Sequence, residues 1–346
     1  MNFDALNDLD PRKNSQYSLS AVLTMAFYAL LAGETDFVGI AEFCDLRRFT
    51  FRRVFGYDKV PSHDTFNRVF KLVDPASMEL FFREFAGPLG RFAEQIALDG
   101  KAHTNSQSHI VSAFTSNGVC LGSADTGAGK QNELATMIRM VKQLNVKNTI
   151  VTTDAMGCND GLFKEIIRQR GDYVCALKKN QKNAFEDVDL LFRSEIFKFD
   201  EDTFTDKHNG KAVTYSISVR SRPTELEALH KFTGLKAIAR VVKETQGTAP
   251  ETRYYLASIT DPKQIHECVR NHWHVENKLH WVLDVRFRED QGTVRDKVAL
   301  KNLNVIRKIA INLMNHFKVG IKRSFMRKIC CSEEFILATM RNWRVV

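Results

Sequence analysis

The order of predicted strands and helices over residues 96–199 limits the possible folds of the chain more than any other sequence feature. Five short apolar strands are predicted, at 96–102, 109–114, 119–125, 149–155 and 173–180. Three helices are predicted, at 129–144, 161–170 and 184–197. Three consecutive strands, followed by strands that alternate with helices, predict an α/β fold with a mixed sheet flanked by helices.

Two of these strands carry an acid near their carboxyl ends, Asp99 in the first and Asp154 in the fourth. Ligands of α/β sheets bind at the carboxyl ends of strands. An Asp there is partly desolvated, and a neighbouring Asp repels it unless a cation lies between them. A single Asp in this place is commonly a turn former, so it is the pair that indicates a metal site.

A third acid lies in the segment 270–290, which contains no Gly or Pro and predicts a long helix. At 3.6 residues per turn, four polar residues fall at steps of four on one stripe: His272, Glu276, His280 and Asp284. The adjoining sector is apolar and predicts burial. Such a stripe binds a metal, binds an anionic partner through its imidazoles, or forms a structural network. These three interpretations stay open.

Only one acid of this stripe can join the strand-end pair at a metal site. Glu276 and Asp284 are separated by about 12 Å along a helix, whereas paired catalytic metals lie about 4 Å apart. Glu276 has the longer side chain and two flanking imidazoles. We therefore expect Glu276 to be the ligand, and Asp284 to pair with Arg286 or Arg288 or to accept a hydrogen bond from the sheet.

The remaining residues predict a helical domain before the sheet and a strand-rich insertion within it. In residues 1–95, Ser62 is a predicted N-cap and Asp74-Pro75 separates two helices. Short capped helices with interspersed Arg indicate a helix-turn-helix-like DNA reader, a pattern shared by other compact helical domains. Residues 200–260 predict a β insertion with strands at 214–221, 236–242 and 252–259. The core then ends over 261–318, before a basic segment at 319–346.

Charge favours a polyanionic partner. The chain has 50 Lys and Arg against 41 Asp and Glu, a net charge of +9. From residue 301 onward there are ten basic residues against Glu333 and Glu334, and a second basic cluster lies at 47–59. Basic segments near both ends indicate nucleic acid, although charge that serves only solubility gives the same composition.

The sequence favours neither a membrane protein nor a protein of an oxidising compartment. No apolar run approaches the roughly 20 residues that span a bilayer, and the run at 19–33 follows acidic residues, unlike a signal peptide. The seven Cys are scattered, with no CxxC pair. A cytoplasmic protein without disulfides or a zinc site is expected.

Five motifs together resemble bacterial insertion-sequence transposases of the H-repeat-associated type. They are LDGKA (98–102), GKQNEL (129–134), VTTDAMGCND (151–160), DYVCALKKNQ (172–181) and HWHVENKLHWVLDVRFRED (272–290). VPSHDTFNRVF (60–70) resembles the helical domain of that family. The resemblance covers about residues 17–317. It implies a ribonuclease-H-like core with an Asp-Asp-Glu triad, a β insertion before the Glu helix and an N-terminal helical domain.

The resemblance also implies a function. Asp99, Asp154 and Glu276 would be the catalytic residues and the ligands of two Mg²⁺ ions, with Mn²⁺ as a substitute. The reaction would be cleavage and strand transfer of double-stranded DNA at the terminal inverted repeats and the target, by a homodimer in the synaptic complex at the bacterial nucleoid. Seven residues are candidates for DNA contacts: Lys130, Lys178, Lys179, Arg270, His272, His280 and Trp281.

The chain departs from related patterns in three places. No Arg follows soon after Asp99, the segment 206–216 differs from a Gly-His-Gly-Arg-type turn, and His272 and Leu283 replace an Arg and a Lys beside the Glu. Two alternatives therefore remain. One is a decayed or repurposed transposase that acts as a DNA-binding protein, and the other is a nuclease that cuts without joining.

Overall fold

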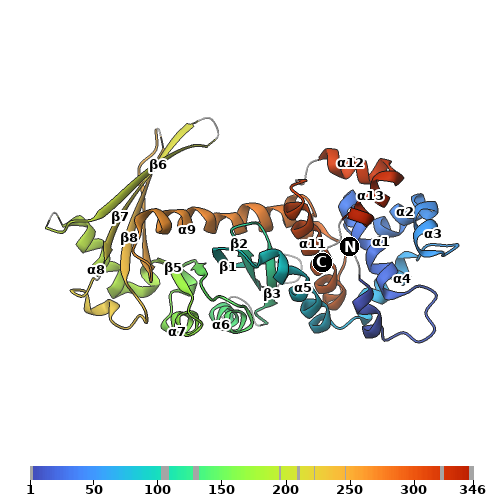
Figure 1. Ribbon diagram of the computed structural model, residues 1–346, viewed down its shortest axis with the longest axis horizontal. Helices are drawn as coiled ribbons and strands as arrows, with labels where there is room; N and C mark the ends of the chain where they lie inside the picture. Colours follow the sequence, from blue (N-terminus) through green and yellow to red (C-terminus); the bar gives the residue numbers. More distant parts are fainter. Residues whose placement is uncertain are drawn as a thin grey trace.

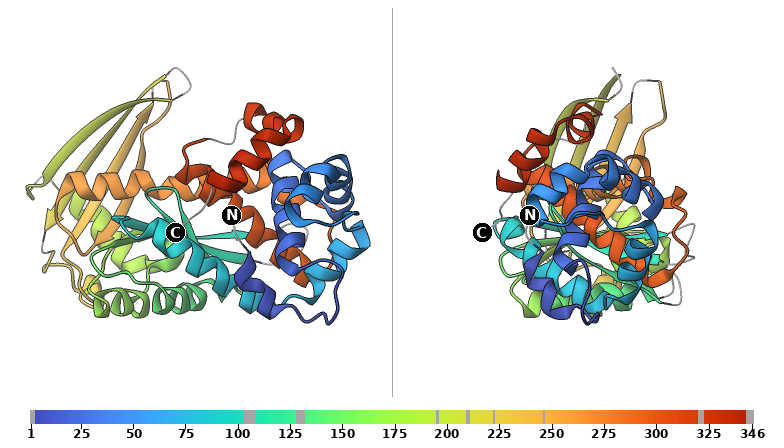
Figure 2. Two further views of the ribbon diagram at one scale, coloured as in Figure 1. Left: turned by 45° about the vertical axis from the view of Figure 1, so that its right-hand side comes forward. Right: turned by 90° about the vertical axis from the view of Figure 1, so that its right-hand side faces the viewer.

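The computed structural model describes residues 3–102, 109–127, 132–194, 196–208, 211–221, 223–245, 247–319 and 323–342. The molecule is elongated, with a strand-rich end and a helical end (Figure 1). One helix, α9 (Pro262–His274), runs between the two ends. Figure 2 shows the same separation from two other directions. Both marked termini lie toward the helical end.

One mixed sheet contains nine strands in the order β3-β2-β1-β4-β5-β9-β8-β7-β6. Their bounds are β1 Gln95–Ala102, β2 His109–Thr115, β3 Cys120–Asp125, β4 Ile150–Thr153, β5 Asp172–Leu177, β6 Asp200–His208, β7 Lys211–Ser221, β8 Ala237–Thr245 and β9 Glu251–Ala257. The pairs β1–β4 and β4–β5 are parallel, and every other neighbouring pair is antiparallel. The predicted α/β class with a mixed sheet is confirmed.

The strands of the predicted β insertion extend this sheet. The last of them, β9, pairs with β5 from Val174↔Ala257 to Leu177↔Tyr254. The edge strand β6 was not predicted, because its sequence DEDTFTDKH lacks regular apolar alternation. Residues 209 and 210, in the segment that departs from related patterns, lie outside the described residues.

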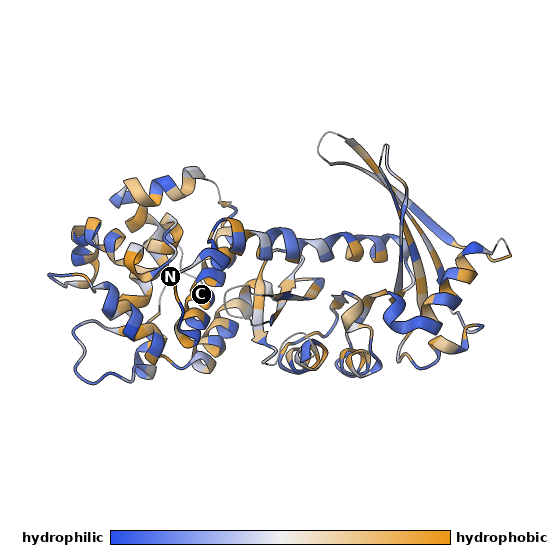
Figure 3. Ribbon diagram, turned by 180° about the vertical axis from the view of Figure 1, so that it is seen from behind, coloured by the Kyte–Doolittle hydropathy of each residue, from blue (hydrophilic) through white to orange (hydrophobic). Residues whose placement is uncertain are grey.

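The two faces of the sheet carry different helices, because successive strand residues point to opposite sides. On β1, Ile96 and Leu98 belong to a core shared with three helices, α6 Glu133–Gln143, α7 Asp160–Arg168 and α8 Lys182–Arg193. On the opposite face, Ile265 and Val269 of α9 pack against β4, β5 and their neighbours. Figure 3 shows hydrophilic and hydrophobic residues alternating along α9. Asp99 therefore faces α9 and not α6.

The helix predicted over 270–290 is shorter and less regular than expected. α9 continues into a π-helical turn, Val275–His280, and then into α10, Trp281–Val285. The predicted uniform spacing of the polar stripe is wrong over this turn, because i→i+5 hydrogen bonding widens the helix. The apolar side is nevertheless buried, including Val275 and Leu279.

Five helices form the N-terminal part of the helical end: α1 Leu19–Ala32, α2 Phe37–Leu46, α3 Arg48–Phe55, α4 His63–Leu72 and α5 Pro75–Gly90. The predicted cap at Ser62 and the predicted helix break at Asp74-Pro75 are confirmed. The Ser62 hydroxyl accepts a hydrogen bond from the amide of Thr65, and Asp74 caps α5 with Pro75 in its first turn. No single helix in the described ranges is long and apolar enough to cross a membrane.

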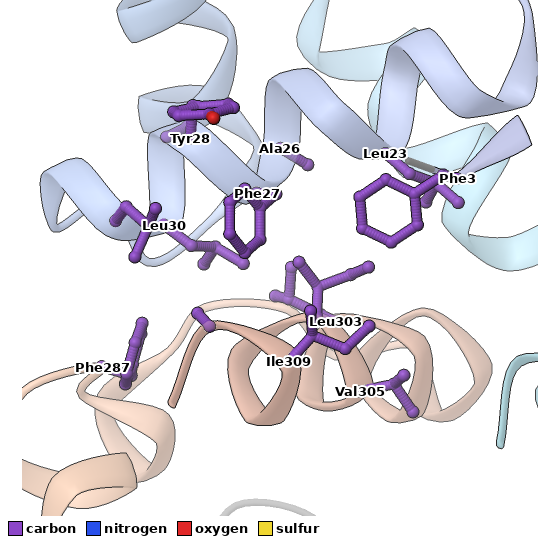
Figure 4. Close-up of a cluster of buried hydrophobic side chains, with 14 of the residues drawn as sticks. Phe3, Leu23, Ala26, Phe27, Tyr28, Leu30, Phe287, Leu303, Val305 and Ile309 are labelled. Carbon is purple, nitrogen blue, oxygen red and sulfur yellow. The ribbon is translucent and has the colours of Figure 1, made fainter. Parts of the chain in front are cut away.

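The last part of the chain packs back onto these first helices. α11 (Lys297–His316) contacts α1, α4 and α5, and Leu303 and Ile309 face Phe27 across the interface (Figure 4). α12 (Arg323–Cys331) and α13 (Glu333–Asn342) follow, and the Thr339 hydroxyl donates a hydrogen bond to the Tyr28 hydroxyl on α1. One hydrophobic core therefore unites sequence segments from both ends of the chain.

Candidate active site

Asp99, Asp154 and Glu276 line one cavity of about 410 Å³. They come from β1, from the residue after β4 and from the π-helical turn. Three acids that are far apart in the sequence therefore share one solvent-accessible space.

The parallel pairing of β1 and β4 places the two Asp side by side. Its register runs from Gln95↔Ile150 to Leu98↔Thr153, so Asp99 and Asp154 are the next residues on each chain. At Asp154 the chain leaves the strand, and the side chain accepts a hydrogen bond from the amide of Met156. The carboxylates thus emerge where the two strands begin to separate.

The negative charges of these three carboxylates repel one another. Burial, together with the nearby charges of Asp154, Glu276 and Glu133, raises the pKa of Asp99 to about 7. A divalent cation would relieve this repulsion, so the donor set fits Mg²⁺, which prefers oxygen ligands. Within the described ranges, no three Asp, Glu, His or Cys side chains form a ready-made coordination shell.

The two imidazoles beside Glu276 have different partners. His280 Nδ1 lies 3.4 Å from Oδ2 of Asp99. His272 Nδ1 lies 2.9 Å from the hydroxyl oxygen of Thr152, which also accepts a hydrogen bond from the Gln95 side chain. Burial lowers the pKa of His272 to about 4, so this imidazole is neutral at pH 7. The contacts with Thr152 and Gln95 could not be predicted from the sequence.

Asp284 takes its partner from the sheet, one of the alternatives that the sequence left open. The Nζ of Lys101, on β1, donates a hydrogen bond to Asp284 and another, 2.7 Å long, to Glu289. Arg286 instead lies over the ring of Trp281, at 5.3 Å from its centroid. Asp284 does not line the triad cavity.

The candidate DNA contacts are dispersed. Lys178 and His272 line the triad cavity, and Arg270 lines a neighbouring one. Lys179 is exposed on the turn after β5, and the half-exposed Trp281 lines neither cavity. Lys130 lies outside the described residues.

The neighbouring cavity has a volume of about 380 Å³ and lies between α9 and the strands β7, β8 and β9. It shares Arg253 and Trp273 with the triad cavity, and the Arg253 guanidinium lies 4.8 Å from the centroid of the Trp273 ring. Lys243 and Arg270 add two more cations, and Glu251, which pairs with Arg253, adds one negative charge. Arg253 and Lys243 were not predicted from the sequence, because an isolated basic residue on a polar strand does not indicate a site.

The chain is similar to transposases in every comparison described below. Residues 93–313 match the family described as "Transposase DDE domain", and residues 2–86 match the family described as "DDE_Tnp_1-associated". The chain is 30% identical to the "H repeat-associated putative transposase YhhI" of Escherichia coli (strain K12), over 94% of this chain and 93% of the relative. It is 29% identical to the "Putative transposase YncI" of Escherichia coli O157:H7, over 96% of this chain and 92% of the relative.

Proposed function

Because the chain belongs to the DDE transposases of insertion sequences, we propose that it cleaves double-stranded DNA at the ends of such an element and joins them to a target. The mixed sheet with its N-terminal helices is the ribonuclease-H-like fold of this family. The observation that carries the proposal is the meeting of Asp99, Asp154 and Glu276 at one cavity.

The three acids would bind two Mg²⁺ ions, with Mn²⁺ as a substitute. When bound, the metals supply activation of the attacking water or 3′-hydroxyl and charge stabilisation at the leaving 3′-oxygen. Asp99 and Asp154 contribute oxygens fixed by the sheet, and Glu276 contributes them from the helix above. His280 orients Asp99 through their contact. His272, held neutral by burial, offers a hydrogen bond without adding charge.

The cationic cavity beside the triad supports a path for the DNA strand that leaves the cleavage site. Lys243, Arg253 and Arg270 bring positive charge to it, and Trp273 adds an aromatic face that is 39% exposed. Cations that follow a phosphate backbone, together with an aromatic surface for bases, suit single-stranded DNA. Lys178 would contact phosphate at the triad itself.

We also propose that residues 1–95 recognise the terminal repeats. Arg48, Arg52 and Arg53 are exposed on α3, and DNA phosphates would take the place of their surface partners Asp45, Asp58 and Glu333. The basic residues of 319–346 would add affinity that does not depend on sequence, and two copies would hold the two ends in a synaptic complex.

The test is cleavage of a duplex that carries the element's own ends, by purified protein with Mg²⁺, with Mn²⁺ or with EDTA. We expect nicking at the end only with a metal, and joining of the freed 3′-hydroxyl to target DNA. Asp154→Asn should abolish both while the variant still binds the ends. Cleavage that persists in EDTA would refute the metal mechanism.

Two other outcomes would identify the alternatives. Specific binding of the ends without any cleavage by the wild type would indicate a transposase that acts only as a DNA-binding protein. Cleavage without joining, under conditions where target DNA is in excess, would indicate a nuclease. Because the three acids are all present, we do not prefer a DNA-binding protein or a nuclease to a transposase.

A further inference from the structure

Two residues on one face of β1 both contact the helix that carries Glu276. Asp99 contacts His280, and Lys101 contacts Asp284. Residues two apart on a strand lie about 7 Å apart on the same face, and residues four apart on a helix lie about 6 Å apart along its axis. The two spacings match, so the pair of contacts fixes the helix in one register along β1.

Lys101 has two carboxylate partners, Asp284 and the more deeply buried Glu289. The Lys101 side chain is 11% exposed, and that of Glu289, its second partner, is 1% exposed. Removing one partner of a buried ion pair is strongly destabilising, because the remaining charges lose their compensation. Lys101 thus joins β1 to Asp284, near the end of α10, and to Glu289 just beyond it.

The charged group formed by Lys101, Asp284 and Glu289 also interacts with the helical end of the molecule, through Arg307. Arg307 on α11 is fully buried, and the charge of Glu289 acts on it. Its guanidinium donates hydrogen bonds to the Asn304 side chain, at 2.6 Å, and to the carbonyl oxygen of Thr35, at 3.1 Å. Thr35 lies between α1 and α2. A shift of Lys101 would therefore disturb the boundary between the catalytic sheet and the helical end.

We propose that Lys101 is a positioning residue for cleavage, which sets the location of Glu276 relative to Asp99 by holding Asp284 and Glu289. It does not line the triad cavity, so it acts through the helix and not on the substrate. This inference rests on the proposed function, because it gives Lys101 a role in the same triad. Catalytic geometry is sensitive to displacements of about 1 Å, which can cost a hundredfold in rate.

The test compares Lys101→Met with Lys308→Met in the full-length protein. Lys308 is a matched control, because it is also buried and also joins two elements, donating a hydrogen bond from α11 to the Ser123 hydroxyl on β3. Hydrogen exchange reports the order of the helix without any metal, and calorimetric titration with Mn²⁺ reports the metal site without any DNA. Urea unfolding measures the stability of each variant.

We expect Lys101→Met to speed amide exchange over 275–289, to weaken Mn²⁺ binding about tenfold and to lower single-turnover cleavage by about ten- to a hundredfold. Lys308→Met should lose comparable stability, leave exchange over 275–289 unchanged and retain Mn²⁺ affinity. Lys101→Arg should recover part of the affinity, because it keeps the charge.

Unchanged exchange over 275–289 in folded Lys101→Met would overturn the inference, as would equal effects of Lys308→Met on Mn²⁺ binding. Failure of the proposed function has a different signature. In that case the wild type would not cleave DNA or would not bind Mn²⁺, while the exchange comparison would still decide whether Lys101 orders the helix.

Discussion

His280 Nδ1 lies 3.4 Å from the carboxylate of Asp99, on the face of β1 that Lys101 shares. This contact brings a titratable ring to the acid whose pKa burial and the neighbouring carboxylates raise to about 7. The protonation state of Asp99 therefore changes near neutral pH, which makes the triad measurable through stability as well as through catalysis.

The first prediction concerns stability against pH in metal-free protein. An acid whose pKa is about 7 when folded, against a usual value of 3.8, keeps its proton longer in the folded state. Its contribution is present below pH 4 and is lost as the pH rises toward 7. A shift of this size corresponds to about 4 kcal/mol as an upper bound. Urea unfolding at several pH values should show Asp99→Asn gaining stability over the wild type from pH 4 to 7.

Divalent metal should remove most of this difference, because bound cations favour the ionised carboxylate. In the same unfolding series, Mg²⁺ at about 10 times its Kd should stabilise the wild type above pH 6 and leave Asp99→Asn nearly unaffected. A variant that tracks the wild type at every pH would contradict the raised pKa.

The second prediction separates the two acids of the polar stripe. Glu276→Gln should lower single-turnover cleavage by orders of magnitude and leave binding of end DNA intact, since it removes a ligand but keeps the shape. Asp284→Asn should cost stability and a modest factor in rate, because Asp284 accepts a hydrogen bond from Lys101 outside the cavity. Circular dichroism checks the fold of both. The reverse order of effects in folded proteins would displace Glu276 from the triad.

The third prediction concerns the cationic cavity. Arg253→Gln should weaken binding of single-stranded DNA and reduce the slope of log affinity against log salt by about 0.7, the value for one phosphate contact with a single strand. Trp273→Ala should weaken binding by about 1–3 kcal/mol with little change in slope, because stacking is not a charge effect. Arg193→Gln on α8 is a suitable control, since Arg193 is 73% exposed and lines neither cavity. Equal losses in all three variants would argue against a strand path here.

The fourth prediction assigns sequence preference to α3. Replacing Arg48, Arg52 and Arg53 by Gln should reduce the preference for terminal repeats over random DNA. Replacing the exposed Arg327, Lys328 and Arg341 should flatten the salt dependence and keep the preference. Point substitutions are preferable to deleting 319–346, because α12 and α13 pack against α1. A competition binding assay measures both quantities, and loss of preference in the C-terminal variant would reverse the assignment.

Local features of the fold could be predicted from local sequence. The strand around Asp99, the cap at Ser62 and the helix break at Asp74-Pro75 each depend on a few adjacent residues. The edge strand β6 escaped prediction, because its side chains are mostly polar and its pairing with β7 supplies the order. The continuity of the sheet also depends on a distant partner, since β9 joins β5 across about 80 residues of chain.

In the candidate site too, features that depend on local sequence could be predicted and features that depend on distant partners could not. Residue types and motif resemblance identified the three acids, but neither predicted the partners Lys101 and Thr152, which are set by tertiary packing. The π-helical turn was missed because an apolar pattern with one irregular turn still resembles an α-helix in sequence. Arg253 was missed because a single Arg on a polar strand carries no signal until its position near the triad is known.

The packing of α1 against α11 has a consequence for how the protein is made. At about 5–20 residues per second, α11 leaves the ribosome roughly 10–60 s after α1. During that time the apolar α1, buried along almost its whole length in the finished protein, lacks one of the helices that cover it. Nascent chains would therefore depend on chaperones, and a transcript cut short before α11 would yield a protein prone to aggregation. A chain that ends before α11 is therefore expected to lack a stable helical end.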